Sequence, residues 1–258
     1  MSSASDFPIL EIKNAVFGYA KGKALINSLS FSVGNGEFIG LLGANGSGKS
    51  TILKLAAGIL SPSGGQILLW NKPLKSYKNR DRAKLICYLP QVLDINVPFR
   101  VRDLVSMGLY PYDILPGITV DSAIEMVGLS ANKDSYLTNL SGGERRRAFI
   151  AMTLVQDAGL LLLDEPLANL DIKYQAEIIR LLRELKDRKN ITMLMALHDI
   201  NLALRFEKII LIKEGNVLGF GKPEKVLTSE LLHEAFGISM DIRKDELRGT
   251  TISYGNEF

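Results

Sequence analysis

The 258-residue chain has very few of the residues that build disulfide frameworks and zinc sites. Its single cysteine, Cys87, cannot form an internal disulfide, and its two histidines, His198 and His233, leave no zinc site with the usual cysteine and histidine spacing. Cys87 lies in the apolar run 85–89, which favours a small buried residue of a strand over a reactive thiol. The sequence therefore predicts a fold stabilised by an ordinary hydrophobic core.

The chain also lacks long apolar runs and a strong charge of one sign. Runs such as 160–163 are far shorter than the ~20 residues that span a bilayer, so we expect other subunits to provide any membrane spans. The N-terminus shows no basic stretch followed by an apolar one, which predicts a cytosolic chain without a signal peptide. With 31 Lys and Arg against 28 Asp and Glu, the formal charge of +3 is too small to indicate a nucleic-acid partner.

Strand-like and helix-like patterns alternate along the chain, which predicts an α/β fold. The turn Gly34-Asn35-Gly36 predicts a hairpin between two early strands, and prolines in 110–117 exclude a regular helix there. The predicted strands are 9–19, 29–33, 37–42, 66–70, 160–163, 191–197, 209–212 and 216–219. The predicted helices are 48–58, 120–128, 143–156, 171–189, 223–227 and 229–236. We expect one domain over 1–258, with a core of about 1–91 and 157–258 and a helical subdomain of about 92–156.

Residues 43–50, Gly-Ala-Asn-Gly-Ser-Gly-Lys-Ser, match the phosphate-binding loop pattern G-x-x-x-x-G-K-[ST]. A predicted strand precedes the loop and a predicted helix follows it, so backbone N–H groups and the helix N-terminus can point at phosphate oxygens. We expect Lys49 to neutralise the β- and γ-phosphates and the Ser50 hydroxyl to bind Mg²⁺. The residues expected to hold the nucleotide here are Gly43, Asn45, Gly46, Ser47, Gly48, Lys49, Ser50 and Thr51.

Two carboxylates, Asp164 and Glu165, follow the buried strand predicted at 160–163. Open α/β sheets bind ligands at the carboxyl ends of their strands. We therefore expect Asp164 to hold Mg²⁺ and Glu165 to polarise an attacking water. An isolated Asp-Glu pair would more often be a solvated turn, but a phosphate-binding loop in the same chain favours the catalytic interpretation. These two motifs fit a kinase, a GTPase, a helicase or a transporter motor.

A third motif, Leu140-Ser141-Gly142-Gly143-Glu144, stands just before the helix predicted at 143–156. Alone it would be an ordinary helix N-cap. Placed between the phosphate-binding loop and the strand that ends at Asp164, it resembles the signature of the ATP-binding cassette (ABC) transporter ATPase family. The resemblance covers about 9–228. Further matching positions are Tyr19 (an adenine-stacking aromatic), Gln91 (the glutamine loop), Asp171 (the loop between subunits) and His198 (the switch histidine).

The resemblance implies a P-loop NTPase cassette, with a RecA-like core, an antiparallel β subdomain and an inserted α-helical subdomain. It implies ATP and Mg²⁺ as cofactors, with Ser50, Gln91 and Asp164 around the metal. It also implies Glu165 and His198 as catalytic residues. Two cassettes, most simply a homodimer, would bind head to tail. In that dimer the residues of one cassette that touch the γ-phosphate held by the other would be Ser141, Gly142 and Gly143.

The stretches 101–111, 198–203 and 219–223 are similar to cassettes of iron–siderophore, haem and cobalamin importers. This implies an ATPase at the cytoplasmic face of the cell (inner) membrane, bound to two transmembrane permease subunits through a groove near 91–109. A periplasmic or extracellular substrate-binding protein would be an indirect partner. The segment between Pro111 and Val120 is shorter than in typical members of that group, a departure in the partner-facing region that leaves the cargo open, and Tyr112 stands where a histidine is common.

Three other functions also fit a chain with a phosphate-binding loop. The motor of another transport system, for a metal ion, a vitamin or export, has the same motifs and differs only in partner and cargo. A cassette ATPase of DNA repair or translation would usually carry two cassettes or a coiled-coil insertion. A P-loop kinase would leave 140–144 without a purpose. The run Arg145-Arg146-Arg147 is expected to place at least one arginine on a solvated helix face.

Overall fold

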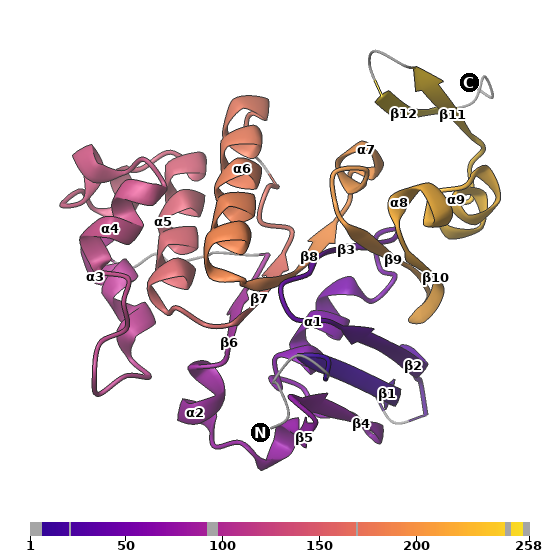
Figure 1. Ribbon diagram of the computed structural model, residues 1–258, viewed down its shortest axis with the longest axis horizontal. Coiled ribbons are helices and arrows are strands. Elements are labelled where there is room, and N and C mark those ends of the chain that lie inside the picture. Colours follow the sequence, from indigo (N-terminus) through magenta and orange to yellow (C-terminus); the bar gives the residue numbers. More distant parts are fainter. Residues whose placement is uncertain (1–6, 21, 92–97, 169, 246–248, 255–258) are drawn as a thin grey trace.

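The computed structural model describes residues 7–20, 22–91, 98–168, 170–245 and 249–254, and Figure 1 shows their arrangement. The central sheet has the strand order β10-β9-β3-β8-β7-β6, and all neighbours are parallel except the edge pair β9–β10. Its strands are β3 (Phe38–Leu42), β6 (Ile86–Leu89), β7 (Leu160–Asp164), β8 (Thr192–Leu197), β9 (Lys208–Lys213) and β10 (Asn216–Gly221). All residues of β3, β7 and β8 are buried, as expected for parallel strands covered on both faces.

A second, antiparallel sheet has the order β2-β1-β4-β5. Its strands are β1 (Leu10–Phe17), β2 (Ile26–Val33), β4 (Gly64–Leu69) and β5 (Lys72–Pro73). Helix α1 (Lys49–Ala56) lies between the two sheets, and its side chains Ile52, Leu53 and Leu55 join both in one buried core. The phosphate-binding loop therefore starts a helix that is held by two layers.

The predicted hairpin across Gly34-Asn35-Gly36 is wrong. Strand β2 pairs with β1, whereas β3 pairs with β8 and β9 in the other sheet. Instead of closing a hairpin, the Gly36 N–H donates to the Thr192 hydroxyl at 2.8 Å, and the Glu37 side chain accepts from the Gly34 N–H. The physical reason is that every residue of β3 is apolar or glycine and needs cover on both faces, which a two-stranded pairing would not supply.

The second core covers the other face of the central sheet and includes most of the remaining helices (Figure 1). These are α3 (Val101–Ser106), α4 (Val120–Met126), α5 (Gly142–Val155), α6 (Ile172–Lys189), α7 (Ile200–Ala203), α8 (Pro223–Val226) and α9 (Ser229–Phe236). The segment 110–117 contains no helix, as predicted from its prolines. The helix α2 (Asn79–Ala83) precedes β6, where Cys87 is 2% exposed and burial raises the pKa of its thiol to about 12.

A final hairpin, β11 (Met240–Asp245) and β12 (Gly249–Tyr254), follows α9 and was not predicted. Apolar and polar residues alternate over 240–243 and 251–254, so the pattern that predicts a strand was present but only four residues long in each arm. Short 3₁₀ turns, Leu74–Ser76, Met107–Leu109, Ser130–Asn132 and Leu137–Asn139, complete the structure. In the described part of the chain, no helix combines the length and the apolar character needed to cross a membrane.

Candidate active site

The phosphate-binding loop runs from the end of β3 to the start of α1, as predicted. Gly48 caps α1 with φ +105°, a conformation that a side chain would strain. A Cβ added at Gly43 would lie 2.5 Å from the Ile212 carbonyl oxygen, so the loop and β9 approach each other too closely for any other residue. Glycine is therefore required at both ends of the loop.

Lys49 is buried beneath this loop, with 6% of its surface exposed. Its Nζ donates to the carbonyl oxygens of Gly43 at 2.8 Å and Ala44 at 3.3 Å, and it lies 3.7 Å from Oε1 of Glu165. Burial lowers the pKa of Lys49, while the nearby carboxylates of Glu165 and Asp164 act in the opposite direction. A desolvated cation at the start of a helix is a strong attractor for phosphate oxygens.

Asp164 ends β7 and is almost fully buried, at 2% exposure. Its Oδ1 accepts a hydrogen bond of 3.0 Å from the Ser50 hydroxyl, and its Oδ2 accepts one of 3.2 Å from the Tyr88 hydroxyl. Burial raises the pKa of Asp164, and these two hydrogen bonds oppose the shift. The sequence analysis missed Tyr88, whose place opposite Leu162 in the β6–β7 register carries its hydroxyl to this carboxylate.

The residues around Asp164 fit Mg²⁺ rather than a metal held wholly by protein. Ser50 and Asp164 offer oxygen ligands within hydrogen-bond distance of each other. In the ranges that the structure describes, no three His, Cys, Asp or Glu side chains form a group able to hold a metal. Mg²⁺ typically takes one or two protein oxygens and completes its shell with water and substrate phosphates. A hydroxyl and a carboxylate beside a phosphate-binding loop are such a donor set.

Glu165 brings three of the predicted residues together, namely Lys49, Gln91 and His198. Its Oε2 accepts a 2.8 Å hydrogen bond from Nε2 of Gln91 and lies 3.9 Å from Nδ1 of His198. Its backbone has φ +47°, a left-handed conformation that is strained for a residue with a side chain. Such strain concentrates at functional sites, where surrounding structure holds the residue in place. The Glu165 side chain is 12% exposed, whereas that of His198 is 56% exposed.

A cavity of about 370 Å³ opens over these groups. Its lining residues are Leu25, Asn45, Gly46, Ser47, Gly48, Lys49, Ser50, Thr51, Gln91 and Glu165. Tyr19 lies at the same loop, because its hydroxyl is 3.2 Å from that of Thr51. The Tyr19 ring packs edge-on against Phe17 and is 65% exposed, so one aromatic face is available to a flat ligand.

The predicted residues of the signature motif lie apart from this cluster. Ser141 caps α5, and its hydroxyl and backbone N–H exchange hydrogen bonds with Glu144, which lowers the pKa of that glutamate. Asp171 stands at the exposed N-terminus of α6. Within the described residues, no hydrogen bond or ion pair links Ser141, Gly142, Gly143 or Asp171 to the loop 43–50. Residues 92–97 of the predicted permease-facing groove lie outside the described residues.

Arg146 is a site residue that the sequence analysis did not identify. Of the three arginines, only Arg145 is partly exposed, and Arg146 is 6% exposed. The guanidinium donates to backbone carbonyls on both sides of the active site: Pro90 at 3.3 Å, Gln91 at 2.8 Å, Asp164 at 3.1 Å, Glu165, and Pro166 at 2.9 Å. The sequence did contain a signal for this burial. Arg146 and Ile150 are four residues apart and therefore lie on the same face of α5, and Ile150 is buried.

Comparison with known proteins agrees with this arrangement. The family model for the ABC transporter matches residues 26–168, more than half of the chain. The chain is 38% identical to the petrobactin import ATP-binding protein FpuC of Bacillus anthracis, over 89% of this chain and 87% of that protein. It is 36% identical to the hemin import ATP-binding protein HmuV of Rhodopseudomonas palustris (strain HaA2), over 92% and 93% of the two chains.

Solved structures show the same fold. An ABC transporter described as being of the metal-chelate type, in an inward-facing conformation, superposes with a TM-score of 0.80 at 27% identity. The match covers 97% of this chain and 99% of that one. The α/β cassette fold expected from the sequence is thereby confirmed. The family model and the curated relatives together show that the chain belongs to the ABC transporter family, as one of its ATP-hydrolysing subunits.

Proposed function

We propose that this chain drives the import of a metal chelate, such as a ferric siderophore or haem, through a separate membrane permease. The observation that carries the proposal is similarity over most of its length to proteins named for petrobactin and hemin import. The likeness to a transporter of the metal-chelate type supports it. Cobalamin, also a metal chelate, belongs to the same chemical class and is included in the test below.

In the proposed site, the triphosphate of ATP lies along the loop 43–50. Backbone N–H groups of the loop and the Lys49 ammonium would bind the β- and γ-phosphates, and the exposed ring of Tyr19 would stack on the adenine. Ser50 and Asp164, with Gln91, would hold Mg²⁺, which when bound screens phosphate charge. The 2.8 Å bond from Lys49 to Gly43 holds the ammonium at the loop.

Glu165 is the proposed general base. Its carboxylate lies beside Lys49, Gln91 and His198, all of which reach it from different elements. A carboxylate held there would orient a water for attack on the γ-phosphorus and accept its proton. His198, 3.9 Å away, would contact the γ-phosphate and the same water. The Gln91 bond occupies one carboxylate oxygen, so we propose that Gln91 moves when Glu165 engages water.

A second copy of the chain would complete each site. The first turn of α5 has backbone N–H groups without an intrahelical partner, at Gly142 and Gly143, and these suit an anion. In a head-to-tail homodimer they would bind the γ-phosphate held by the partner cassette, and Asp171 would lie at the contact between the subunits. Hydrolysis is then linked to closure of the dimer.

The proposed permease contact lies on the surface after α3. Tyr110, Ile114 and Leu115 are 86%, 87% and 69% exposed, an unusual group of apolar side chains for a water-facing surface. A groove of about 520 Å³ beside them is lined by Asn79, Arg80, Ala83, Tyr110 and Pro111. We propose that a cytoplasmic segment of one permease subunit fills this groove, and that a second permease subunit binds the partner cassette in the same way, at the cytoplasmic face of the cell membrane. A substrate-binding protein on the other side would act indirectly.

The test is uptake by cells of the native host from which the gene for this chain has been deleted. Uptake of a radiolabelled ferric siderophore, of haem and of cobalamin is measured after complementation with wild type or with Glu165→Gln. Loss of uptake of one chelate on deletion, restored by wild type and not by Glu165→Gln, is the expected result. Normal uptake of all three by the deleted strain would overturn the cargo proposal, and would direct the search to other transported substrates.

A further inference from the structure

The C-terminal hairpin β11–β12 lies beyond the part of the chain that the family model matches. It packs on α9 and on α7, the short helix that begins two residues after His198 (Figure 1). The side chains of Met240 and Ile252 are 4% and 7% exposed and belong to the core of the domain. The hairpin is therefore an integral part of the fold on the His198 side.

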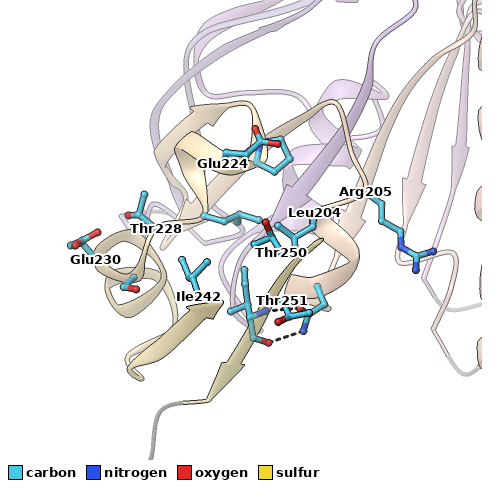
Figure 2. Close-up of a pocket in the computed structure, with 13 residues that line it drawn as sticks. Leu204, Arg205, Glu224, Thr228, Glu230, Ile242, Thr250 and Thr251 are labelled. Carbon is cyan, nitrogen blue, oxygen red and sulfur yellow. Dashed lines mark hydrogen bonds between the residues drawn. The ribbon is translucent and has the colours of Figure 1, made fainter. Parts of the chain in front are cut away.

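Asn201 ties this hairpin to α7 through both ends of its side-chain amide. Its Nδ2 donates to the carbonyl oxygen of Ile252 at 2.9 Å, and its Oδ1 accepts from the N–H of Ile252 at 2.9 Å. Figure 2 shows hydrogen bonds between the drawn residues as dashed lines, in a cavity of about 750 Å³ whose lining includes Asn201 and Ile252 together with Leu204, Thr250 and Thr251. The amide thus pairs with the strand as another strand would.

The hairpin also borders the surroundings of His198 directly. A second cavity, of about 350 Å³, is lined by His198, Asp199, Ile200 and Asn201 on one side and by Met240, Ile252 and Ser253 on the other. Helix α7 has only four residues, so its own hydrogen bonds cannot hold it. Asp199 caps it with a 3.1 Å bond from the Leu202 N–H, and Asn201 fixes its outer side.

His198 depends on this support. Its side chain is 56% exposed, and the partner within 4 Å that the structure gives it is the Glu165 carboxylate, at 3.9 Å. The ring position is thus set by the backbone between β8 and α7. We infer that Asn201 is a positioning residue for His198, and that the C-terminal hairpin holds the histidine in place against Glu165 through this amide. The inference rests on the proposed role of His198.

The test compares Asn201→Ala, which removes both bonds, with Asn201→Asp, which keeps the acceptor and opposes a carboxylate to the Ile252 carbonyl. Asn216→Ala is the matched control, since the side chain of that exposed asparagine donates to Glu214 O in the β9–β10 turn, away from His198 and the C-terminal hairpin. ATPase turnover, affinity for a fluorescent ATP analogue and the melting temperature are measured on the full chain. Both Asn201 variants are also made in a His198→Ala background.

If Asn201 acts through His198, Asn201→Ala lowers kcat about tenfold, within the range expected when a catalytic group is displaced by ~1 Å. Nucleotide affinity stays within about twofold, because the phosphate-binding loop is untouched. In the His198→Ala background the same substitution causes no further loss. The two histidines of the chain provide a spectroscopic readout: the ring NMR signal of His198 shifts or broadens, while that of His233 serves as reference.

Unchanged turnover in both Asn201 variants, with turnover lost in His198→Ala, would overturn this inference and leave the proposed function standing. An additional loss in the His198→Ala background would also overturn it, because Asn201 would then act elsewhere. Full turnover in His198→Ala itself would remove that residue from the proposed mechanism. If Asn201→Ala melts below the assay temperature, Asn201→Asp decides the same question.

Discussion

The Nε2 atom of Gln91 lies 2.8 Å from Oε2 of Glu165, so a side chain that follows β6 is hydrogen-bonded to one that follows β7. The two strands are parallel neighbours, and both side chains project from the same edge of the sheet. One oxygen of the proposed base is therefore occupied by a loop that comes from another part of the chain. Any movement of that loop changes the hydrogen bonding of Glu165.

Glu165→Gln should stop hydrolysis and spare nucleotide binding. The amide keeps the size of the carboxylate but cannot accept a proton, so kcat should fall by roughly 10²–10⁴-fold, the usual contribution of a general base. Turnover and ATP affinity are measured side by side, with Glu184→Gln on the exposed face of α6 as the control. ATP-bound dimers should accumulate, as seen by size exclusion. Turnover near that of wild type would remove Glu165 from the role of base.

Lys49→Ala should remove nucleotide binding. The buried ammonium donates to the loop carbonyls of Gly43 and Ala44, and its loss removes charge-assisted bonds to phosphate. Bonds to charged groups contribute about 1.5–3 kcal/mol, so affinity should fall by at least ~10-fold. Equilibrium binding of a fluorescent ATP analogue checks this, with the exposed Lys72→Ala as control. Equal affinity in the two variants would contradict the proposed phosphate site.

Asp164→Asn should raise stability while abolishing Mg²⁺-dependent hydrolysis. Burial raises the pKa of Asp164 above its unfolded value, so the folded state holds the proton more tightly than the unfolded state does. Its ionisation therefore costs stability, and this cost appears as pH rises from the unfolded pKa through the folded pKa. At neutral pH the amide should therefore raise Tm, because it removes the cost of ionising a buried carboxyl group.

The pH dependence is the control for that prediction. Thermal melts of wild type and Asp164→Asn are compared from pH 7 downward, and the difference between their Tm values should shrink as Asp164 takes up its proton. A Tm difference that grows on acidification would show the opposite linkage. A lower Tm for the amide at neutral pH would mean that the bonds from Ser50 and Tyr88 outweigh desolvation.

Arg146→Ala should lower the free energy of unfolding. The substitution leaves the carbonyls of Gln91, Asp164 and Pro166 without their buried donor, which should cost about 2–4 kcal/mol. Arg145→Ala is the matched control, since that side chain is only partly buried and donates to Leu140 O at 3.2 Å. Denaturant unfolding measures both variants. Equal stability of the two would show that the carbonyl contacts of Arg146 contribute little.

Some parts of the site could be predicted from sequence because they are contiguous. The loop 43–50 contains its own glycines, lysine and hydroxyl, and its flanking strand and helix are local patterns. Asp164 and Glu165 follow a buried apolar run for the same reason. When the residues of a site lie close together in the sequence, the pattern of residue types is sufficient to predict the site.

Other parts depend on pairing between distant segments, which residue patterns do not determine. Tyr88 reaches Asp164 only because β6 lies beside β7, and Asn201 meets Ile252 only because the last hairpin folds back on α7. The turn Gly34-Asn35-Gly36 has hairpin chemistry, yet the burial of β3 on both faces decided where that strand pairs. Local turn preferences are weaker than burial of a whole strand.

Strands β2 and β3 belong to different sheets, and this has a consequence for the proposed ATP site. Tyr19 follows the first strand of one sheet, the loop 43–50 follows a strand of the other, and α1 packs between the two layers. The adenine and the triphosphate would thus be bound by residues of two different sheets, joined through the packing of α1. A change in that packing would alter affinity for the base and leave affinity for the phosphates intact. Selectivity for one base over another would then depend on how the two sheets are positioned relative to each other.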